Sequence, residues 1–141
     1  TKALPRLARA ASNPELVTAF ETHLEETLGQ VERIDQVVEV LGIKLKRIKC
    51  AAMEGLVEEG KEVIEEVEKG PVRDAALIGG AQKVEHYEIA SYGTIAALAK
   101  QLGYKDALPL LLATLQEEKA TDEKLTLIAK ASSGAQAAKA A

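Results

Sequence analysis

The segment from Asp74 to Leu102 contains no proline, and its apolar residues recur with the period of an α-helix. At about 100° per residue, one stripe of this helix collects Leu77, Ala81, Val84, Tyr92, Ile95, Ala99 and Leu102. Glu85 and Glu88 fall on the same stripe. Two carboxylates in the middle of a core-facing stripe are costly unless positive charge meets them. The segment therefore predicts a long core helix with a cationic or metal partner.

The composition favours an all-α protein of one domain. Aromatic residues make up 3% of the 141 residues, and Ala and Leu supply most of the apolar side chains. This balance favours helices over sheets. The net charge of -4 argues against a nucleic-acid partner, and no apolar run approaches the roughly 20 residues that span a bilayer. The single cysteine, Cys50, excludes an internal disulfide and fits a reducing compartment.

Cap and turn residues mark the expected helix boundaries. Asn13 and Pro14 are typical of an N-cap followed by the first helical position, and Gly42 is typical of a helix end. Gly70 and Pro71 interrupt the next helical pattern. We expect helices over residues 1–12, 14–41, 51–69, 71–102 and about 107–131, and a low-complexity tail over residues 132–141. The first residues already follow a helical pattern, so we expect the first helix to begin before Thr1.

The lengths of the connections indicate how these helices pack. Short turns before residue 14 and at residues 103–106 favour two antiparallel helix pairs. The connection over residues 43–70 is long, begins with a basic stretch and carries its own helix, so it can cross the bundle. Four helices with one long central crossover is the connectivity of ferritin-like bundles. We therefore predict one ferritin-like four-helix bundle over residues 1–131, although other four-helix arrangements also fit the lengths.

Polar residues interrupt the apolar stripe of three helices at plausible depths for one shared layer. They are His23 and Glu26 on the second helix, Glu85 and Glu88 on the third, and Glu118 and Asp122 on the fourth. Like charges about 4 Å apart cost several kcal/mol at an effective dielectric constant of 20. A metal ion would neutralise them, and oxygen ligands with an imidazole suit iron or manganese better than structural zinc. Alternatively, the acids are staggered and each meets a basic side chain such as Arg6, Arg9 or Arg33.

Several stretches resemble the YciE/YciF family of bacterial stress-associated proteins in the ferritin-like superfamily. They are Lys2–Ser12, His23–Thr27, Gly42–Cys50, Gly70–Asp74, Val84–Tyr92 and Glu117–Leu125, which together sample nearly the whole chain. The resemblance implies a ferritin-like bundle with an added crossover helix, a homodimer, a cytoplasmic location and induction by stress, with no established reaction. It also implies a glutamate on the first helix just before the point where this chain begins.

These observations support two hypotheses. The first is a stress protein with a carboxylate-rich di-metal site, in which His23, Glu26, Glu85, Glu88, Glu118 and Asp122 bind iron or manganese and a small oxidant such as oxygen or peroxide reacts. The second is a non-catalytic dimeric stress protein with a vestigial site. His86 faces away from the stripe and is expected in solvent, Tyr92 is expected to be a packed core residue, and Cys50 an idle thiol.

Overall fold

The computed structural model describes residues 1–46 and 48–140, with side chains through residue 132. The described residues form helices and connecting segments without strands, which confirms the predicted all-α class. The helices are α1 (Leu4–Ala10), α2 (Pro14–Leu41), α3 (Ala51–Glu66), α4 (Pro71–Leu102) and α5 (Leu108–Ala140). The predicted ends of α2 and α4 coincide with those observed. The last helix continues past residue 131 because its final residues are rich in alanine, the strongest helix former.

The chain turns from α1 into α2 through a capped and anchored corner. The Asn13 side chain accepts a hydrogen bond from the Glu15 amide at 2.8 Å, as an N-cap does. The buried carboxylate of Asp74, at the start of α4, accepts bonds from the amides of Ser12 at 2.7 Å and Asn13 at 2.9 Å. It also accepts a bond from the Ser12 hydroxyl at 2.5 Å. One carboxylate thus fixes the start of α2 against the start of α4.

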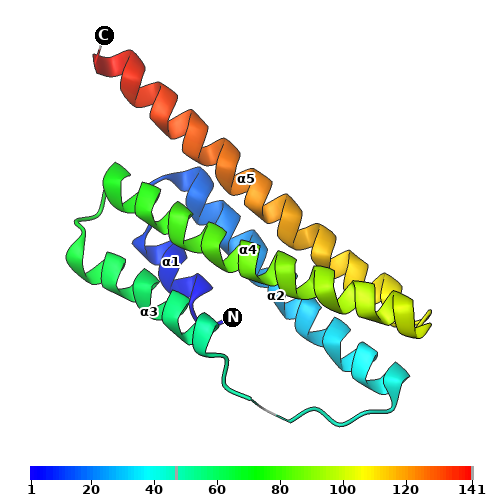
Figure 1. Cartoon of the computed structure of the whole chain (residues 1–141). Helices are drawn as coiled ribbons and strands as arrows, with labels where there is room; N and C mark the ends of the chain where they lie inside the picture. The colour runs from blue at the N-terminus through cyan, green and yellow to red at the C-terminus, as the bar shows by residue number, and fades with distance from the viewer. Residues whose placement is uncertain (47, 141) are drawn as a thin grey trace.

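The long helices pack as the connection lengths predicted (Figure 1). Helix α2 runs parallel to α4, and α5 returns antiparallel along both of them. Between α2 and α4, an extended segment and the crossover helix α3 bring the chain back to the end at which α2 began. Helix α1 is short and packs on α2 at that same end. This is the predicted ferritin-like connectivity, with α3 as the added crossover helix.

The apolar core divides into two clusters. The larger one lies at the α1 end and includes Leu16, Phe20, Leu77 and Leu125, all of them almost fully buried. The smaller one lies at the opposite end and joins Val37, Ala96, Ala99, Ala107 and Leu111. Between the two in sequence, on each long helix, come buried polar residues. The fold therefore leaves a polar layer at mid-height of the bundle.

Some residues that the periodicity assigned to the core are exposed. Ile95 is 47% exposed and Leu102 65%, so their predicted burial is wrong. The reason is coverage, because α1 and α3 lie along the first half of α4 and not along its second half (Figure 1). In the part of the chain that the structure describes, no helix combines the length and apolar character needed to cross a membrane.

Candidate metal centre

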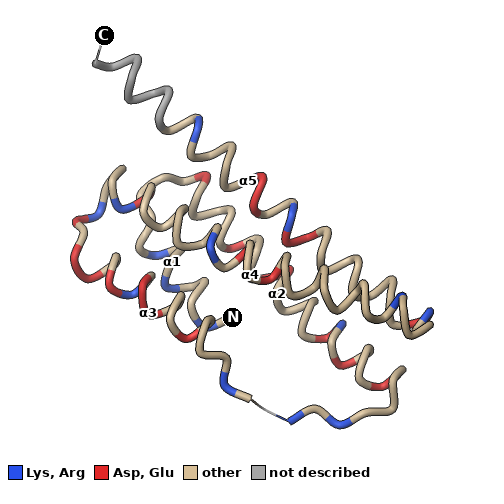
Figure 2. Tube along the Cα trace, in the orientation of Figure 1, with Lys and Arg blue, Asp and Glu red and all other residues tan. Residues whose placement is uncertain are grey.

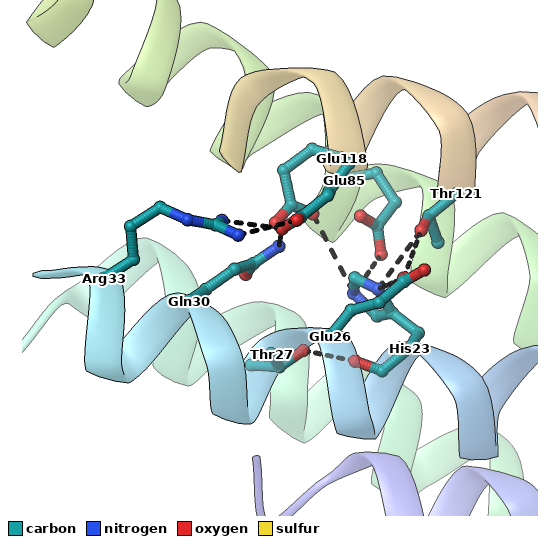
Figure 3. A network of polar contacts seen from close by, with 9 residues as sticks. His23, Glu26, Thr27, Gln30, Arg33, Glu85, Glu118 and Thr121 are labelled. Atoms are coloured by element: carbon teal, nitrogen blue, oxygen red, sulfur yellow. Dashed lines mark hydrogen bonds and ion pairs between the residues drawn. The ribbon is translucent and has the colours of Figure 1, made fainter. Parts of the chain in front are cut away.

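Four side chains from three helices meet in the polar layer. They are His23 from α2, Glu85 and Glu88 from α4, and Glu118 from α5, and one ligand atom from each lies within 4.8 Å of the others. Glu118 is fully buried, Glu85 is 2% exposed and His23 5%. The layer forms because each residue occupies a core-facing position of its helix, with apolar core residues on both sides along the axis. Figure 3 shows His23, Glu85 and Glu118 pointing toward one another.

His23 is held between two pairs of oxygen atoms. Its Nδ1 lies 3.2 Å from Glu26 Oε2 and 3.1 Å from Thr121 Oγ1. Its Nε2 lies 3.4 Å from Glu85 Oε1 and 3.8 Å from Glu118 Oε2. An imidazole that donates its Nδ1 proton to a carboxylate presents Nε2 as a lone-pair donor. The Glu26 contact therefore directs Nε2 into the group of buried carboxylates.

Three of the buried carboxylate oxygens have no hydrogen-bond partner in the described part of the chain: Glu85 Oε2, Glu118 Oε1 and Glu118 Oε2. Burial, followed by the neighbouring Glu118, raises the pKa of Glu85 to about 10. Burial and the same neighbour raise the pKa of Glu88 to about 7. Without a bound cation, Glu85 is therefore held as a neutral acid at neutral pH. Unpaired buried oxygens of this kind call for compensation, either by a proton shared between the two carboxyl groups or by a water or cation.

The donor set fits a divalent transition metal. Three carboxylates and one imidazole converge, and their ligand atoms are close enough to share one small ion. A cation would meet the orphaned oxygens and would reverse the tendency of Glu85 to keep its proton. Carboxylate and imidazole ligands suit iron, manganese or zinc, and the excess of oxygen favours the first two. The observation that supports this fit is the set of unpaired oxygens.

Two of the six sequence-predicted ligands lie outside this group. Glu26 is half-buried and contacts His23 Nδ1 from the side opposite to Glu85 and Glu118. Asp122 is half-buried, and its Oδ1 lies 3.0 Å from Gln82 Nε2 and 3.3 Å from His86 Nε2. In this conformation Glu26 orients the imidazole, whereas Asp122 joins α5 to α4 at the surface.

A second polar cluster, formed further along α2, did not emerge from the sequence. Arg33 donates from both guanidinium nitrogens to the two carboxylate oxygens of Glu117, at 2.8 Å each. It also donates to Thr114 Oγ1 at 2.8 Å, and Gln30 donates to Glu117 at 3.1 Å. Figure 3 shows this cluster beside the carboxylate group. Arg33 is therefore committed to Glu117, and no described lysine or arginine forms an ion pair with Glu85 or Glu118.

The other residues considered in the sequence analysis lie outside the carboxylate group. Tyr92 is partly buried, and burial together with Glu88 raises its pKa to about 12, which keeps it a neutral phenol. The His86 side chain is 69% exposed, which confirms its predicted outward position. Cys50 Sγ lies 3.0 Å from the hydroxyl of Tyr87 at the surface. This hydrogen bond lowers the pKa of the Cys50 thiol.

The chain is similar to known proteins along nearly its whole length. A family model described as "Domain of unknown function (DUF892)" matches residues 1–138. Protein YciF of Escherichia coli (strain K12) is 68% identical over 130 residues, which are 92% of this chain and 78% of that protein. The crystal structure of the E. coli stress protein YciF matches with a TM-score of 0.91 at 65% identity, covering 94% of this chain and 84% of that one. YcfI from Rhodopseudomonas palustris matches with a TM-score of 0.85 at 46% identity, covering 89% and 80%.

Proposed function

This chain belongs to the DUF892 family, and from that membership and its buried carboxylates we propose a bacterial stress-response protein that binds a transition metal in its bundle core. The resemblance to the YciE/YciF family is confirmed by the E. coli relative, which is described as a stress protein. The role in stress comes from that relative. The metal centre rests on the residues of this chain.

The observation that carries the proposal is the group of three unpaired oxygens on Glu85 and Glu118. A core evolved only for stability would fill these positions with apolar side chains, because removing buried charge is often neutral or stabilising. His23, Glu85, Glu88 and Glu118 would hold the ion. A redox-active ion such as iron or manganese would supply positive charge and electron-transfer chemistry toward oxygen or peroxide.

The other residues of the site would prepare it for the ion. Glu26 and Thr121 keep the Nδ1 side of the His23 ring occupied, so that Nε2 remains available to the metal. The pair formed by Arg33 and Glu117 joins α2 to α5 beside the site and fixes the spacing between those helices. The two apolar core clusters lie above and below the layer and shield it along the bundle axis.

Metal content tests this proposal. The purified protein, reconstituted without oxygen with ferrous or manganous ion and freed of excess by gel filtration, should retain near-stoichiometric metal by mass spectrometry. Glu118→Ala should lose that metal. Glu123→Ala, which removes an exposed acid on the same helix, should keep it. Metal retained equally by all three proteins, or by none of them, would contradict the assignment of the buried carboxylates.

The alternative is a non-catalytic dimeric stress protein with an incomplete site. It is favoured by the raised pKa values of Glu85 and Glu88, because protonated acids make the metal-free layer tolerable near neutral pH. Under this alternative the protein stays metal-free and equally stable with and without chelator. We propose a homodimer in the cytoplasm under either function. Light scattering coupled to size-exclusion chromatography tests the dimer, and cell fractionation tests the compartment.

A further inference from the structure

A cavity of about 760 Å³ lies between the crossover helix α3 and the rest of the bundle. It is lined by α1, α3 and the first half of α4. Its volume falls in the range of pockets that hold one small molecule, roughly 300 to 1,000 Å³. None of the four residues of the candidate metal centre lines it. It is therefore a separate feature of the fold, independent of the proposed metal function.

The cavity exists because α3 packs loosely. This helix is amphipathic, yet none of its residues is fully buried. Two glycines lie in the walls, Gly60 on α3 and Gly80 on α4. A Cβ atom added at Gly80 would meet nothing within 4 Å, and one at Gly60 would meet only the tip of Leu7 at 3.9 Å. The space between the helices is thus unfilled even though both walls are rigid helical backbone.

The lining combines an apolar bed with a concentration of positive charge. The apolar side chains come from all three helices and include Leu7, Leu56, Val57, Ile64 and Val84. Five basic residues, Lys2, Arg6, Arg9, Lys61 and Arg73, line the same cavity with one acid, Glu65. This balance is the reverse of that of the whole chain, whose net charge is -4. Figure 2 shows the basic positions of α1 beside the acid-rich α3.

Not all of the basic residues are neutralised by the protein. Lys61 pairs with Glu58 at 2.8 Å, and the Arg73 side chain donates to the Val67 carbonyl at 2.6 Å. The side chains of Lys2, Arg6 and Arg9 form no ion pair in the described part of the chain, although α3 places several acids nearby. Two guanidinium groups at an apolar cavity suit a planar anion that they can bind through paired hydrogen bonds.

We propose that this cavity binds a single-chain amphiphile with a carboxylate head, such as a free medium- or long-chain fatty acid. The hydrocarbon chain lies between α3 and α4 against the apolar side chains and the two glycines. The carboxylate lies at the α1 side, where Arg6 and Arg9 meet it. A carboxylate matches the positive lining in charge, and the hydrocarbon fills space that no protein atom occupies.

Calorimetric titration with dodecanoate below its micelle concentration tests the proposal, using the full purified chain. We expect saturable binding of one molecule per chain, with dodecyltrimethylammonium, which has a similar tail and the opposite charge, failing to bind. Gly80→Leu should block part of the cavity wall and weaken dodecanoate binding by about tenfold or more. Gly79→Leu is the matched control, because its side chain lies outside the cavity on the exposed face of the same helix, and it should bind normally.

The charge contribution has its own pair of variants. The double variant Arg6→Gln/Arg9→Gln should weaken dodecanoate binding by about tenfold, and Lys100→Gln, an exposed charge change elsewhere on α4, should leave it unchanged. Circular dichroism checks that each variant is folded, and metal content checks that the core is intact. Equal binding by Gly80→Leu and Gly79→Leu would overturn the proposal, as would equal affinity for the cationic amphiphile. Binding to anionic phospholipid vesicles without binding of monomeric dodecanoate would also overturn it.

Discussion

The sharpest consequence of the buried carboxylate group concerns stability without metal, and Glu85→Gln isolates it. Glu85 is 2% exposed, and its pKa is raised from 4.5 to about 10. As pH rises above 4.5, the unfolded chain releases this proton while the folded protein keeps it. Folding stability of the metal-free protein therefore falls with rising pH until the pH reaches the folded-state pKa. Glutamine has nearly the same shape and cannot ionise, so it removes this loss.

The size of the effect follows from the same two pKa values. Each pH unit between them costs about 1.4 kcal/mol, so the three units from 4.5 to 7.5 cost the wild-type protein up to about 4 kcal/mol. The buried amide of glutamine has a desolvation cost of its own, which reduces the gain. We expect Glu85→Gln to raise the free energy of unfolding by about 2 kcal/mol at pH 7.5. At pH 4.5 the amide cost is no longer offset, so the variant should be less stable than wild type by about 2 kcal/mol.

The assay is urea unfolding followed by circular dichroism, in the presence of a chelator, at pH 4.5 and 7.5. Glu117→Gln is the matched control, because Glu117 lies next to Glu118 on α5 but is paired with Arg33. That pairing lowers the pKa of Glu117. Its contribution to stability is therefore present above pH 4.5 and is lost as pH falls. We expect Glu117→Gln to destabilise the protein by about 1 kcal/mol at pH 7.5, with a smaller effect at acidic pH.

The two variants should thus change stability in opposite directions at neutral pH. A Glu85→Gln protein that is less stable than wild type at both pH values would show that a protein group, not a proton, compensates Glu85. A gain in stability of the same size at both pH values would show that packing, and not ionisation of Glu85, causes the difference between the two proteins. Either result would contradict the hypothesis that the buried carboxylate group binds a cation.

Three further outcomes are expected. Glu88→Leu should stabilise the chelated protein at pH 8, because it removes a partly buried acid whose pKa is raised to about 7, and thermal unfolding would measure the gain. Manganous-ion affinity measured by titration should rise from pH 6 to pH 8, because Glu85 and Glu88 must both lose their protons to bind metal, and an affinity that is flat over this range would exclude both as ligands. Asp74→Ala should destabilise the bundle by about 3 kcal/mol in urea unfolding, because it leaves the bonds from Ser12 and Asn13 without an acceptor.

Helical periodicity was sufficient to predict much of the candidate site. His23, Glu85 and Glu118 each share a helix face with residues that belong to the apolar core, so their burial follows from the period alone. Their common level follows from the positions of the turns, which set where each long helix begins. The helical period and the positions of the turns can both be read from short stretches of sequence. The predicted connectivity then places the three helices side by side.

Periodicity could not decide between neighbours on one helix. On α5, Thr121 and Asp122 follow Glu118 by three and four residues, and both lie near its face. The structure turns Thr121 toward His23 on α2 and Asp122 toward Gln82 and His86 on α4. Which of the two enters the core depends on how α5 is rotated between its neighbours. That rotation is a property of the packed bundle, and the sequence of α5 alone does not contain it.

The partner of Arg33 was hidden for a related reason. Arg33 and Glu117 are on different helices, and their contact requires α2 and α5 to be antiparallel in one register. Once that register is known, the pairing explains why no basic residue compensates Glu85 and Glu118. Arg33 is held by a two-point ion pair with Glu117 and by Thr114. The bundle thus satisfies one acid of the adjacent pair on α5 with an arginine and leaves the other, Glu118, without a hydrogen-bond partner among the described residues.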